Sequence, residues 1–534
     1  MLVTLNMKET GTMLQGKALK AEVLDTIGVY GLDTQTHPTA LDSKWLIKAD
    51  NIVYTEGGRI TFRKGLYQKT DAESNGNHIG ALYEDAATGT IYGAAGQYMY
   101  EIDLSDPDNA FINSFDTTAS DDDWHFTEIE AGLVAVQTGE GPLILTSSTW
   151  DFMTNDAGYS APAGVAVFDP SCALGAFGRL WVGGVSESNN VLYYSKFEDP
   201  VAFNNGDAGQ IDLKYVWGND EIVAIQSFAG KLVIFGRQNI AIYKNPDDIT
   251  VMGLDEVVRG MGAVFRDSIQ AIGDDIYFLS DTGVRSLSRT AVFDKLPLRE
   301  ISSTIKDEII AHTQNTQNVK SVYVLNEGLY ILSFTDLNVT YVFDLTYMTP
   351  KNTPRVTKWN FDGDREPISL AYSTTQGLLF GEESGNICVY DGYYEVTYDG
   401  TSYTNTPFTG SFSTVWLDLG KGFLSSILKK LILVVSGGSG TDVGIKAFKD
   451  FELSPSTQQT FKVNPNLSGT PYKWGESAAL FGAAKWAPIH GLKEVGVQLQ
   501  GDAKYLRFEM DGVTNGYRTA LQSITLFYKQ GKMY

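Results

Sequence analysis

Short apolar runs separated by turn residues dominate most of the chain. The first clear unit contains the runs Ile79–Tyr83, Ile91–Gly93 and Tyr98–Ile102, separated by Thr88-Gly89 and Gly96-Gln97. Runs this short are typical of β-strands, and glycine-containing turns between them favour hairpins. The pattern therefore predicts a meander of short antiparallel strands.

Similar units recur along the chain at a spacing of roughly 40 to 50 residues, which is the length of a four-stranded propeller blade. The segment from Ala110 to Val165 is ambiguous, so the count is six or seven. The later runs are Phe126–Glu130, Leu133–Gln137 and Leu143–Thr146; Leu180–Gly183 and Val191–Ser195; Ile222–Phe228, Lys231–Phe235 and Ile240–Tyr243; Ser268–Ile272, Ile276–Leu279 and Val284–Leu287; Ser321–Leu325, Leu329–Phe334 and Thr340–Asp344; and Ile368–Ser373, Leu378–Phe380 and Ile387–Tyr390.

A repeat of this kind is compatible with three architectures. A long array of β-sandwiches and a β-solenoid stay open as alternatives. We favour a β-propeller, because small meanders arranged radially bury both faces against their neighbours and leave only short edges.

One segment breaks the strand pattern. Ile301, Ile305 and Ile309 follow one another at intervals of four residues, which predicts a short amphipathic helix over 301–310 packed on the rim of the propeller. A helix that docks a partner is the functional alternative.

The pattern changes after about Tyr394. The polar segment Thr397–Asn405 predicts a linker, and longer alternating strands after it predict one β-sandwich-like domain. We therefore expect an all-β chain with an N-terminal arm and strands over 1–70 that join the C-terminal platform, a propeller over 71–396, and the sandwich-like domain over 397–534. The predicted sandwich strands are Phe412–Leu419, Leu428–Val435, Val443–Phe448, Lys493–Gln498, Tyr505–Met510 and Ile524–Tyr528.

Charge narrows the possible functions. The chain has 41 Lys and Arg against 64 Asp and Glu, a formal net charge of −23. Tight nucleic-acid binding is disfavoured, since that affinity comes largely from cationic side chains that displace counterions. Passage of DNA without binding is compatible with such a surface. The start of the sequence predicts no signal peptide, and no apolar run is long enough to predict a membrane span.

The sequence contains few motifs that would indicate a metal-binding, catalytic or phosphate-binding site. His37, His78, His125, His312 and His490 are too far apart in sequence for a zinc-ligand spacing. The two cysteines, at 172 and 388, lie in apolar runs and are interpreted as small buried residues. The glycine-rich segment 437–444 lies between two strands and predicts a hairpin turn rather than a phosphate-binding loop.

Acidic residues cluster at four places: Asp121–Asp123, Glu382-Glu383, Asp362 with Asp364, and Asp106 with Asp108. Paired carboxylates on a propeller would suit a glycosidase. We interpret these clusters as solvated turns, with an adventitious calcium site at Asp121–Asp123 as the most they would form. We therefore predict no enzyme activity, no catalytic, cofactor-binding or metal-binding residues, and no cofactor.

Several segments together resemble one protein family. The first are Ala49-Asp-Asn51-Ile-Val-Tyr and Gly57-Gly-Arg59-Ile-Thr-Phe-Arg63-Lys-Gly65-Leu, followed by Phe177-Gly-Arg179-Leu-Trp181-Val and Lys231-Leu-Val-Ile-Phe235-Gly-Arg237. Their order resembles the tail nozzle proteins of short-tailed bacteriophages (podoviruses), also called tail tubular protein B or packaged-DNA stabilisation protein. The similarity is best between Leu32 and Leu287. The repeated Phe/Ala-Gly-Arg/Lys-Leu segment itself predicts a tight turn in which glycine supplies a positive φ.

The resemblance implies a structural subunit of the virion tail, assembled in the host cytoplasm. It implies a homohexameric nozzle ring that forms the distal DNA channel, retains the packaged genome and guides its ejection. Implied partners are the tail adapter protein beneath the portal, tail fibres or tailspikes, and genomic DNA passing without sequence specificity. The alternative function is an extracellular glycan-binding or glycan-cleaving β-propeller.

Overall fold

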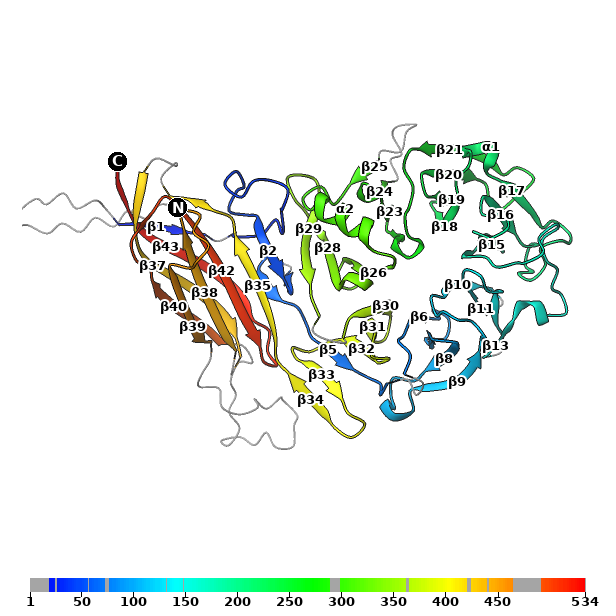
Figure 1. The fold of residues 1–534 in the computed structure, drawn as a ribbon, viewed down its shortest axis with the longest axis horizontal. Coiled ribbons are helices and arrows are strands. Elements are labelled where there is room, and N and C mark those ends of the chain that lie inside the picture. The colour runs from blue at the N-terminus through cyan, green and yellow to red at the C-terminus, as the bar shows by residue number, and fades with distance from the viewer. Residues whose placement is uncertain are drawn as a thin grey trace, which may run out of the picture.

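A computed structural model of the chain describes residues 19–533 apart from 25, 56, 73–75, 131, 147, 289–297, 362–364, 420–423, 439–440 and 464–490. Figure 1 shows a ring of small sheets at one end of the molecule and a stack of long strands at the other. The prediction of an all-β chain with a propeller followed by a β-sandwich-like domain is confirmed.

Six sheets of the ring are built from four consecutive antiparallel strands each, which we number blades 1 to 6. Their strands are β6 (Ala81–Glu84), β7 (Ile91–Ala95), β8 (Tyr98–Ile102) and β9 (Phe111–Asp116); β10 (His125–Ile129), β11 (Gly132–Val136), β12 (Leu143–Thr146) and β13 (Thr149–Phe152); β14 (Cys172–Ala176), β15 (Arg179–Gly183), β16 (Val191–Tyr194) and β17 (Gly209–Asp212); β18 (Ile222–Phe228), β19 (Lys231–Gly236), β20 (Asn239–Lys244) and β21 (Gly253–Arg259); β22 (Gln270–Ile272), β23 (Asp275–Ser280), β24 (Gly283–Ser288) and β25 (Leu298–Glu300); and β26 (Val319–Val324), β27 (Leu329–Phe334), β28 (Val339–Met348) and β29 (Pro354–Trp359).

A seventh sheet closes the ring with strands from two distant parts of the chain. Blade 7 consists of β30 (Pro367–Ser373), β31 (Gly377–Glu382), β32 (Ile387–Tyr390) and the early strand β5 (Leu66–Gln68), which pairs antiparallel with β32. The ring is thus held shut by backbone hydrogen bonds between β5 and β32. β5 precedes residue 71, where we placed the start of the propeller.

The segment predicted as a linker is a hairpin instead. β33 (Glu395–Tyr398) pairs with β34 (Tyr403–Thr406), and β33 also pairs with β5, so the hairpin extends blade 7. The Asp399 carboxylate accepts hydrogen bonds from the backbone N–H groups of Thr401 and Ser402, at 3.0 and 2.7 Å. The linker prediction was wrong because alternating Thr and Tyr can form an exposed strand once such a turn is in place.

Two sheets form the sandwich. The first contains β1, β3, β4, β37, β40, β41 and β43, and the second contains β2, β35, β36, β38, β39 and β42 and continues through β2 into β29 of blade 6. Their bounds are β1 (Lys20–Val23), β2 (Leu46–Asp50), β3 (Ile52–Tyr54), β4 (Ile60–Phe62), β35 (Phe408–Thr414), β36 (Leu417–Asp418), β37 (Leu424–Gly437), β38 (Asp442–Lys449), β39 (Thr457–Lys462), β40 (Gly491–Gln498), β41 (Asp502–Ala503), β42 (Tyr505–Thr514) and β43 (Ala520–Met533).

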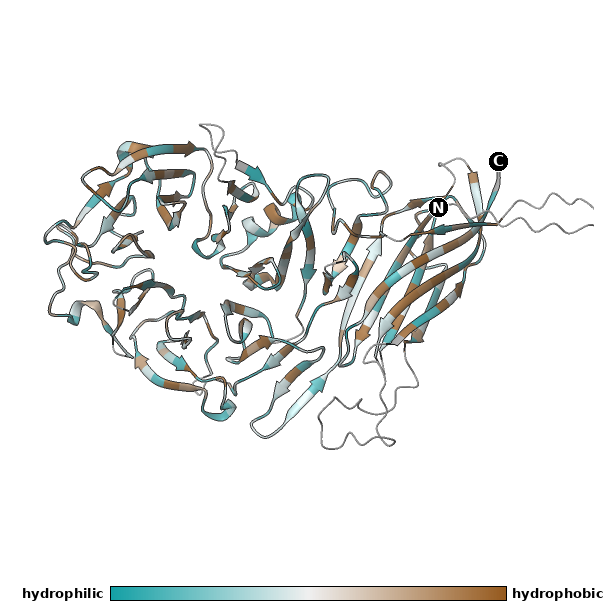
Figure 2. Ribbon diagram, turned by 180° about the vertical axis from the view of Figure 1, so that it is seen from behind, coloured by the Kyte–Doolittle hydropathy of each residue, from teal (hydrophilic) through white to brown (hydrophobic). Residues whose placement is uncertain are grey.

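Separate apolar clusters lie between neighbouring blades, for example one around Tyr92, Trp124 and Trp150 between blades 1 and 2. The cluster between blades 5 and 6 continues into the sandwich, where it includes Leu433 and Phe508. In Figure 2 the hydrophobic colour runs along the sandwich strands that enclose this core. The two parts of the molecule therefore share one core and one continuous sheet.

Helices are few in the described part of the chain. The bounds are α1 (Lys214–Trp217), α2 (Lys306–Asn315), and the 3-10 turns η1 (Pro107–Asn109), η2 (Met153–Asn155), η3 (Arg266–Ser268) and η4 (Thr335–Leu337). The helix predicted over 301–310 is present, but it begins later. Ile301 and Ile305 precede α2, yet they and Ile309 are all buried in the core shared with the sandwich.

Candidate functional site

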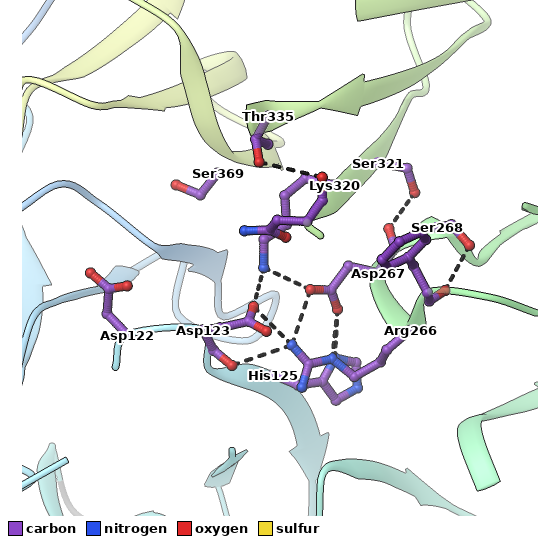
Figure 3. Close-up of polar contacts among 12 residues, drawn as sticks. Asp122, Asp123, His125, Arg266, Asp267, Ser268, Lys320, Ser321, Thr335 and Ser369 are labelled. Atoms are coloured by element: carbon purple, nitrogen blue, oxygen red, sulfur yellow. Dashed lines mark hydrogen bonds and ion pairs between the residues drawn. The ribbon is translucent and has the colours of Figure 1, made fainter. Parts of the chain in front are cut away.

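A group of charged side chains lies at the centre of the ring (Figure 3). We call it the axial cluster: Asp123, His125, Arg266, Asp267 and Lys320. Asp123 lies two residues before His125, the first residue of β10 in blade 2. Arg266 and Asp267 lie in η3, ahead of blade 5, and Lys320 is on β26 of blade 6. The cluster joins blade 2 to blades 5 and 6, which are not its neighbours in the ring.

Arg266 occupies the middle of the cluster. Its Nε donates to Asp267 Oδ1 at 2.8 Å, its Nη2 donates to Asp123 Oδ1 at 3.0 Å, and its Nη1 donates to the Ser171 carbonyl at 2.8 Å. Lys320 Nζ donates to Asp267 Oδ2 at 2.7 Å and also contacts Asp123 Oδ1. His125 Nδ1 lies 3.6 Å from Asp267 Oδ1.

The charges in this cluster stabilise one another. Burial alone would raise the pKa of Asp267, but the nearby charges of Arg266 and Lys320 outweigh burial and hold that pKa well below its usual value. Burial would likewise lower the pKa of Lys320, and the Asp267 and Asp123 carboxylates raise it instead. Arg266, Asp267 and Lys320 are therefore ionised at neutral pH.

This arrangement suits structural cross-linking better than acid–base catalysis. A general acid needs a carboxyl group whose pKa is raised toward the working pH, as in glycosidases. Asp267 has the opposite shift, and both of its carboxylate oxygens are engaged by cations. A cavity of about 420 Å³ adjoins the cluster, lined in part by Asn189, Glu221 and Gln317.

A second charged cluster lies where blade 7 meets the sandwich; we call Arg63, Arg365, Glu382 and Glu395 the junction cluster. Arg63 is 1% exposed and its Nη2 lies 2.9 Å from Glu395 Oε1. Arg365 pairs with Glu395 Oε2 at 3.1 Å and with Glu382 Oε1 at 2.8 Å. The Arg63 guanidinium also lies 4.6 Å from the centroid of the Phe408 ring on sandwich strand β35. These contacts link the closing blade to the second domain.

The segments that carry the family resemblance supply this junction. Asn51 has a φ of 53°, and its Oδ1 accepts from Arg63 Nε at 3.0 Å and from the Asn360 N–H at 2.9 Å. Its Nδ2 donates to the Thr409 carbonyl at 2.9 Å. Asn51 and Arg63 thus connect the end of blade 6 to the sandwich. In the structure these two side chains make contacts between elements of the fold.

Two of the acidic clusters approach each other at His78, whose pKa is raised by the carboxylates of Asp122, Glu383 and Asp121. Treating Asp121–Asp123 as a solvated turn was wrong for Asp122, which is 3% exposed, accepts from the Gly96 N–H at 2.9 Å and lies 3.1 Å from His78 Nε2. Glu382 is also buried, whereas Glu383, Asp106 and Asp108 are exposed. Asp362 and Asp364 lie outside the described residues.

Histidine and cysteine side chains bind a metal ion where several such ligands are grouped. Within the described ranges no three His, Cys, Asp or Glu side chains are grouped so as to hold a metal ion; His490 lies outside those ranges. Both cysteines are buried, as predicted. Burial raises the pKa of Cys172 to about 12. Burial and the Glu382 carboxylate raise that of Cys388.

The glycine-rich segment 437–444 is not the hairpin turn we predicted. β37 ends at Gly437 in the first sandwich sheet, and β38 begins at Asp442 in the second sheet. The segment therefore connects two sheets. The sequence shows two adjacent strands but not whether they pair with each other.

The sequence pattern did not indicate Arg266, Asp267 and Lys320 as site residues. Lys320 lies on a strand between Val319 and Val322, and Arg266 follows Phe265. A charged residue placed inside an apolar run was the signal that could have identified them, because such residues are rarely buried without a partner.

The described helices include none with the length and apolar character needed to cross a membrane. No family model matches the chain. No curated protein matches it either. Among solved structures, the WD40 domain of Neurospora crassa Pan2 is similar to this chain with a TM-score of 0.40 and 8% identity, covering 61% of this chain and 95% of that domain. A likeness at that TM-score carries no functional argument.

Proposed function

We propose that this chain is a structural subunit of a short-tailed phage tail and not an enzyme. Six copies would form the nozzle ring around the distal DNA channel, located in the virion tail after assembly in the host cytoplasm. The ring would retain the packaged genome and guide its ejection. The adapter beneath the portal, and tail fibres or tailspikes, would be its neighbours.

One observation carries the proposal: the charged groups at the centre of the molecule are used to hold the fold together. The axial cluster ties blades 2, 5 and 6 to one another, and the junction cluster ties blade 7 to the sandwich. Together with the β5–β32 closure and the sheet shared with blade 6, these contacts favour a rigid wall segment.

The axial cluster also bears on the route of the DNA. Its side chains meet across the centre of the ring, so a duplex would pass between copies and not through a propeller. The residues that resemble the nozzle family, Asn51 and Arg63, serve the same rigid junction in this chain.

The test is to purify the chain, measure its native mass, and probe purified virions of the phage that encodes it with an antibody against the chain. We expect a mass of six copies and a signal in the virion. A monomer absent from the virion would contradict the proposal. Turnover of a polysaccharide by the purified chain would instead support the glycan-cleaving alternative.

A further inference from the structure

Blades 1 and 2, the loop after them and the first strand of blade 3 carry formal charge of one sign. Residues 70–178 contain 18 Asp and Glu and no Lys or Arg, so this segment accounts for −18 of the formal charge of −23. Several of these acids are exposed on the outer strands or in the adjoining turns, which we call the acidic rim: Asp103, Asp106, Asp116, Asp151 and Asp156. In a ring of copies, the acidic rim of one copy would repel another acidic surface, so it must face either a positively charged surface or solvent.

The first sandwich sheet has an outer face of a different character. Along β37 and β43 the side chains that alternate with the buried ones include Ile432, Val434, Phe527, Lys430 and Lys529, all partly exposed. Ile427 is 45% exposed and Leu492 is 72% exposed on the same sheet. We call this the outer sheet face.

This face pairs apolar area with positive charge. Lys429 is exposed beside Lys430 at the irregularity in the pairing of β37 with β43, and Glu494 is the acidic residue on the neighbouring strand. In the described part of the chain, the most extensive strand contacts of β37 are with β40, β41 and β43 of its own sheet. The opposite face of β37 carries the core residues Leu431 and Leu433. Adjoining exposed apolar side chains of this kind mark sites of contact between proteins.

We propose that the outer sheet face of one copy docks on the acidic rim of the next copy. Figure 1 shows blade 7 and the hairpin of β33 and β34 lying between the sandwich and blades 1 and 2, so the two surfaces are separate within one chain. Contact between unlike surfaces of identical copies is heterologous and closes into a ring when the rotation allows. This inference rests on the ring of the proposed function and names the surfaces that build it.

Charge complementarity supports docking of the outer sheet face on the acidic rim of a second copy. Two acidic rims would repel each other, whereas Lys429, Lys430 and Lys529 facing an acidic rim would attract it and exclude other orientations. Attraction between exposed charges is screened at physiological salt over about 8 Å. Assembly should therefore weaken as salt is raised.

The experiment measures assembly of the full-length chain by analytical ultracentrifugation at low and high salt. The first variant is Asp103→Asn/Asp116→Asn/Asp151→Asn. Asparagine keeps the Oδ1 acceptor through which these three side chains take hydrogen bonds from the nearby backbone N–H groups of Ser105, Thr118 and Phe152. The second is Lys429→Glu/Lys430→Glu/Lys529→Glu. The matched control is Asp247→Asn/Asp274→Asn/Asp281→Asn, which neutralises three exposed acids on blades 4 and 5.

We expect each test variant to raise the concentration needed for half-assembly by about tenfold or more, and the control to leave it unchanged. Adding Asp116→Lys/Asp151→Lys to the lysine variant should restore assembly. A ring that forms equally well in all variants would overturn the inference while leaving the proposed function in place.

Two further outcomes would also overturn it. If the aspartate variant leaves the ring intact but slows DNA release from virions, the acidic rim faces the DNA path instead of a neighbouring copy. If the wild-type chain stays monomeric at every salt concentration, the ring itself is absent and the proposed function fails as well.

Discussion

Gly65 lies where the chain passes from the sandwich hairpin of β3 and β4 into blade 7. A Cβ atom placed there would overlap the backbone carbonyl of Tyr394, which directly precedes β33. The close approach lets the Leu66 N–H reach Glu395 Oε2 at 3.0 Å. The glycine is therefore required by packing against backbone, which cannot move aside as a flexible side chain can.

We predict that Gly65→Ala lowers the free energy of unfolding by about 3 kcal/mol, at the upper end of the cost of overpacking. Urea unfolding of the purified chain measures the change. Gly253→Ala is the matched control, because a Cβ there meets nothing within 4 Å. Equal stability of the two variants would show that the junction is looser than the packing around Gly65 indicates.

The hairpin turns that join the first two strands of blades 3 and 4 have the same backbone conformation. Phe177 and Gly178 have φ values of 57° and 68°, and Ala229 and Gly230 have 52° and 73°. Two consecutive positive φ values define the type I′ turn, which matches the twist of paired strands. The predicted positive φ at glycine is confirmed, and the residue before it shares this conformation.

Ala229→Asn should therefore stabilise the chain, because asparagine adopts the left-handed conformation at less cost than alanine. The gain should be about 1 kcal/mol, close to the cost of that conformation for an ordinary residue. Ala229→Val should have the opposite effect, since a β-branched residue tolerates positive φ poorly. Thermal unfolding of both variants tests the pair, and a lower melting temperature for Ala229→Asn would refute it.

Local pattern predicted most strands because each blade strand alternates or runs apolar between turn residues. The outer strands of the blades, such as β9 (Phe111–Asp116) and β21 (Gly253–Arg259), were missed because none of their residues is fully buried and they carry little apolar signal. The pairing of β5 with β32 joins residues about 320 positions apart, so no local pattern indicates it. The axial cluster escaped prediction for the same reason, since Asp123 and Lys320 meet only when the ring closes.

At the scale of the whole molecule, the axial cluster should make stability depend on acid. The folded-state pKa of Asp267 is held well below 3.8, so its ionised form stabilises the fold. This contribution is fully present above the ordinary pKa and is lost as the pH falls through the folded-state value. The free energy of unfolding of the propeller should therefore fall in acid below about pH 4.

Asp267→Asn removes that dependence. We expect the variant to be less stable than wild type at neutral pH by about 2 to 4 kcal/mol, because Arg266 and Lys320 lose a buried partner. Its free energy of unfolding should then change less steeply with pH in the acid range. Urea unfolding at several pH values measures this, with the exposed Asp281→Asn as control. Parallel pH profiles for wild type and Asp267→Asn would exclude the axial cluster as a source of acid sensitivity.

Electron microscopy of the virion tail can show whether this molecule is an inert, rigid wall segment in a ring. Imaging purified virions beside the isolated chain should reveal a six-fold ring at the distal end of the tail into which six propeller-and-sandwich bodies fit with their axial clusters closed. A tail whose distal density cannot accommodate this body, or a density in which the duplex runs through a propeller, would contradict the account.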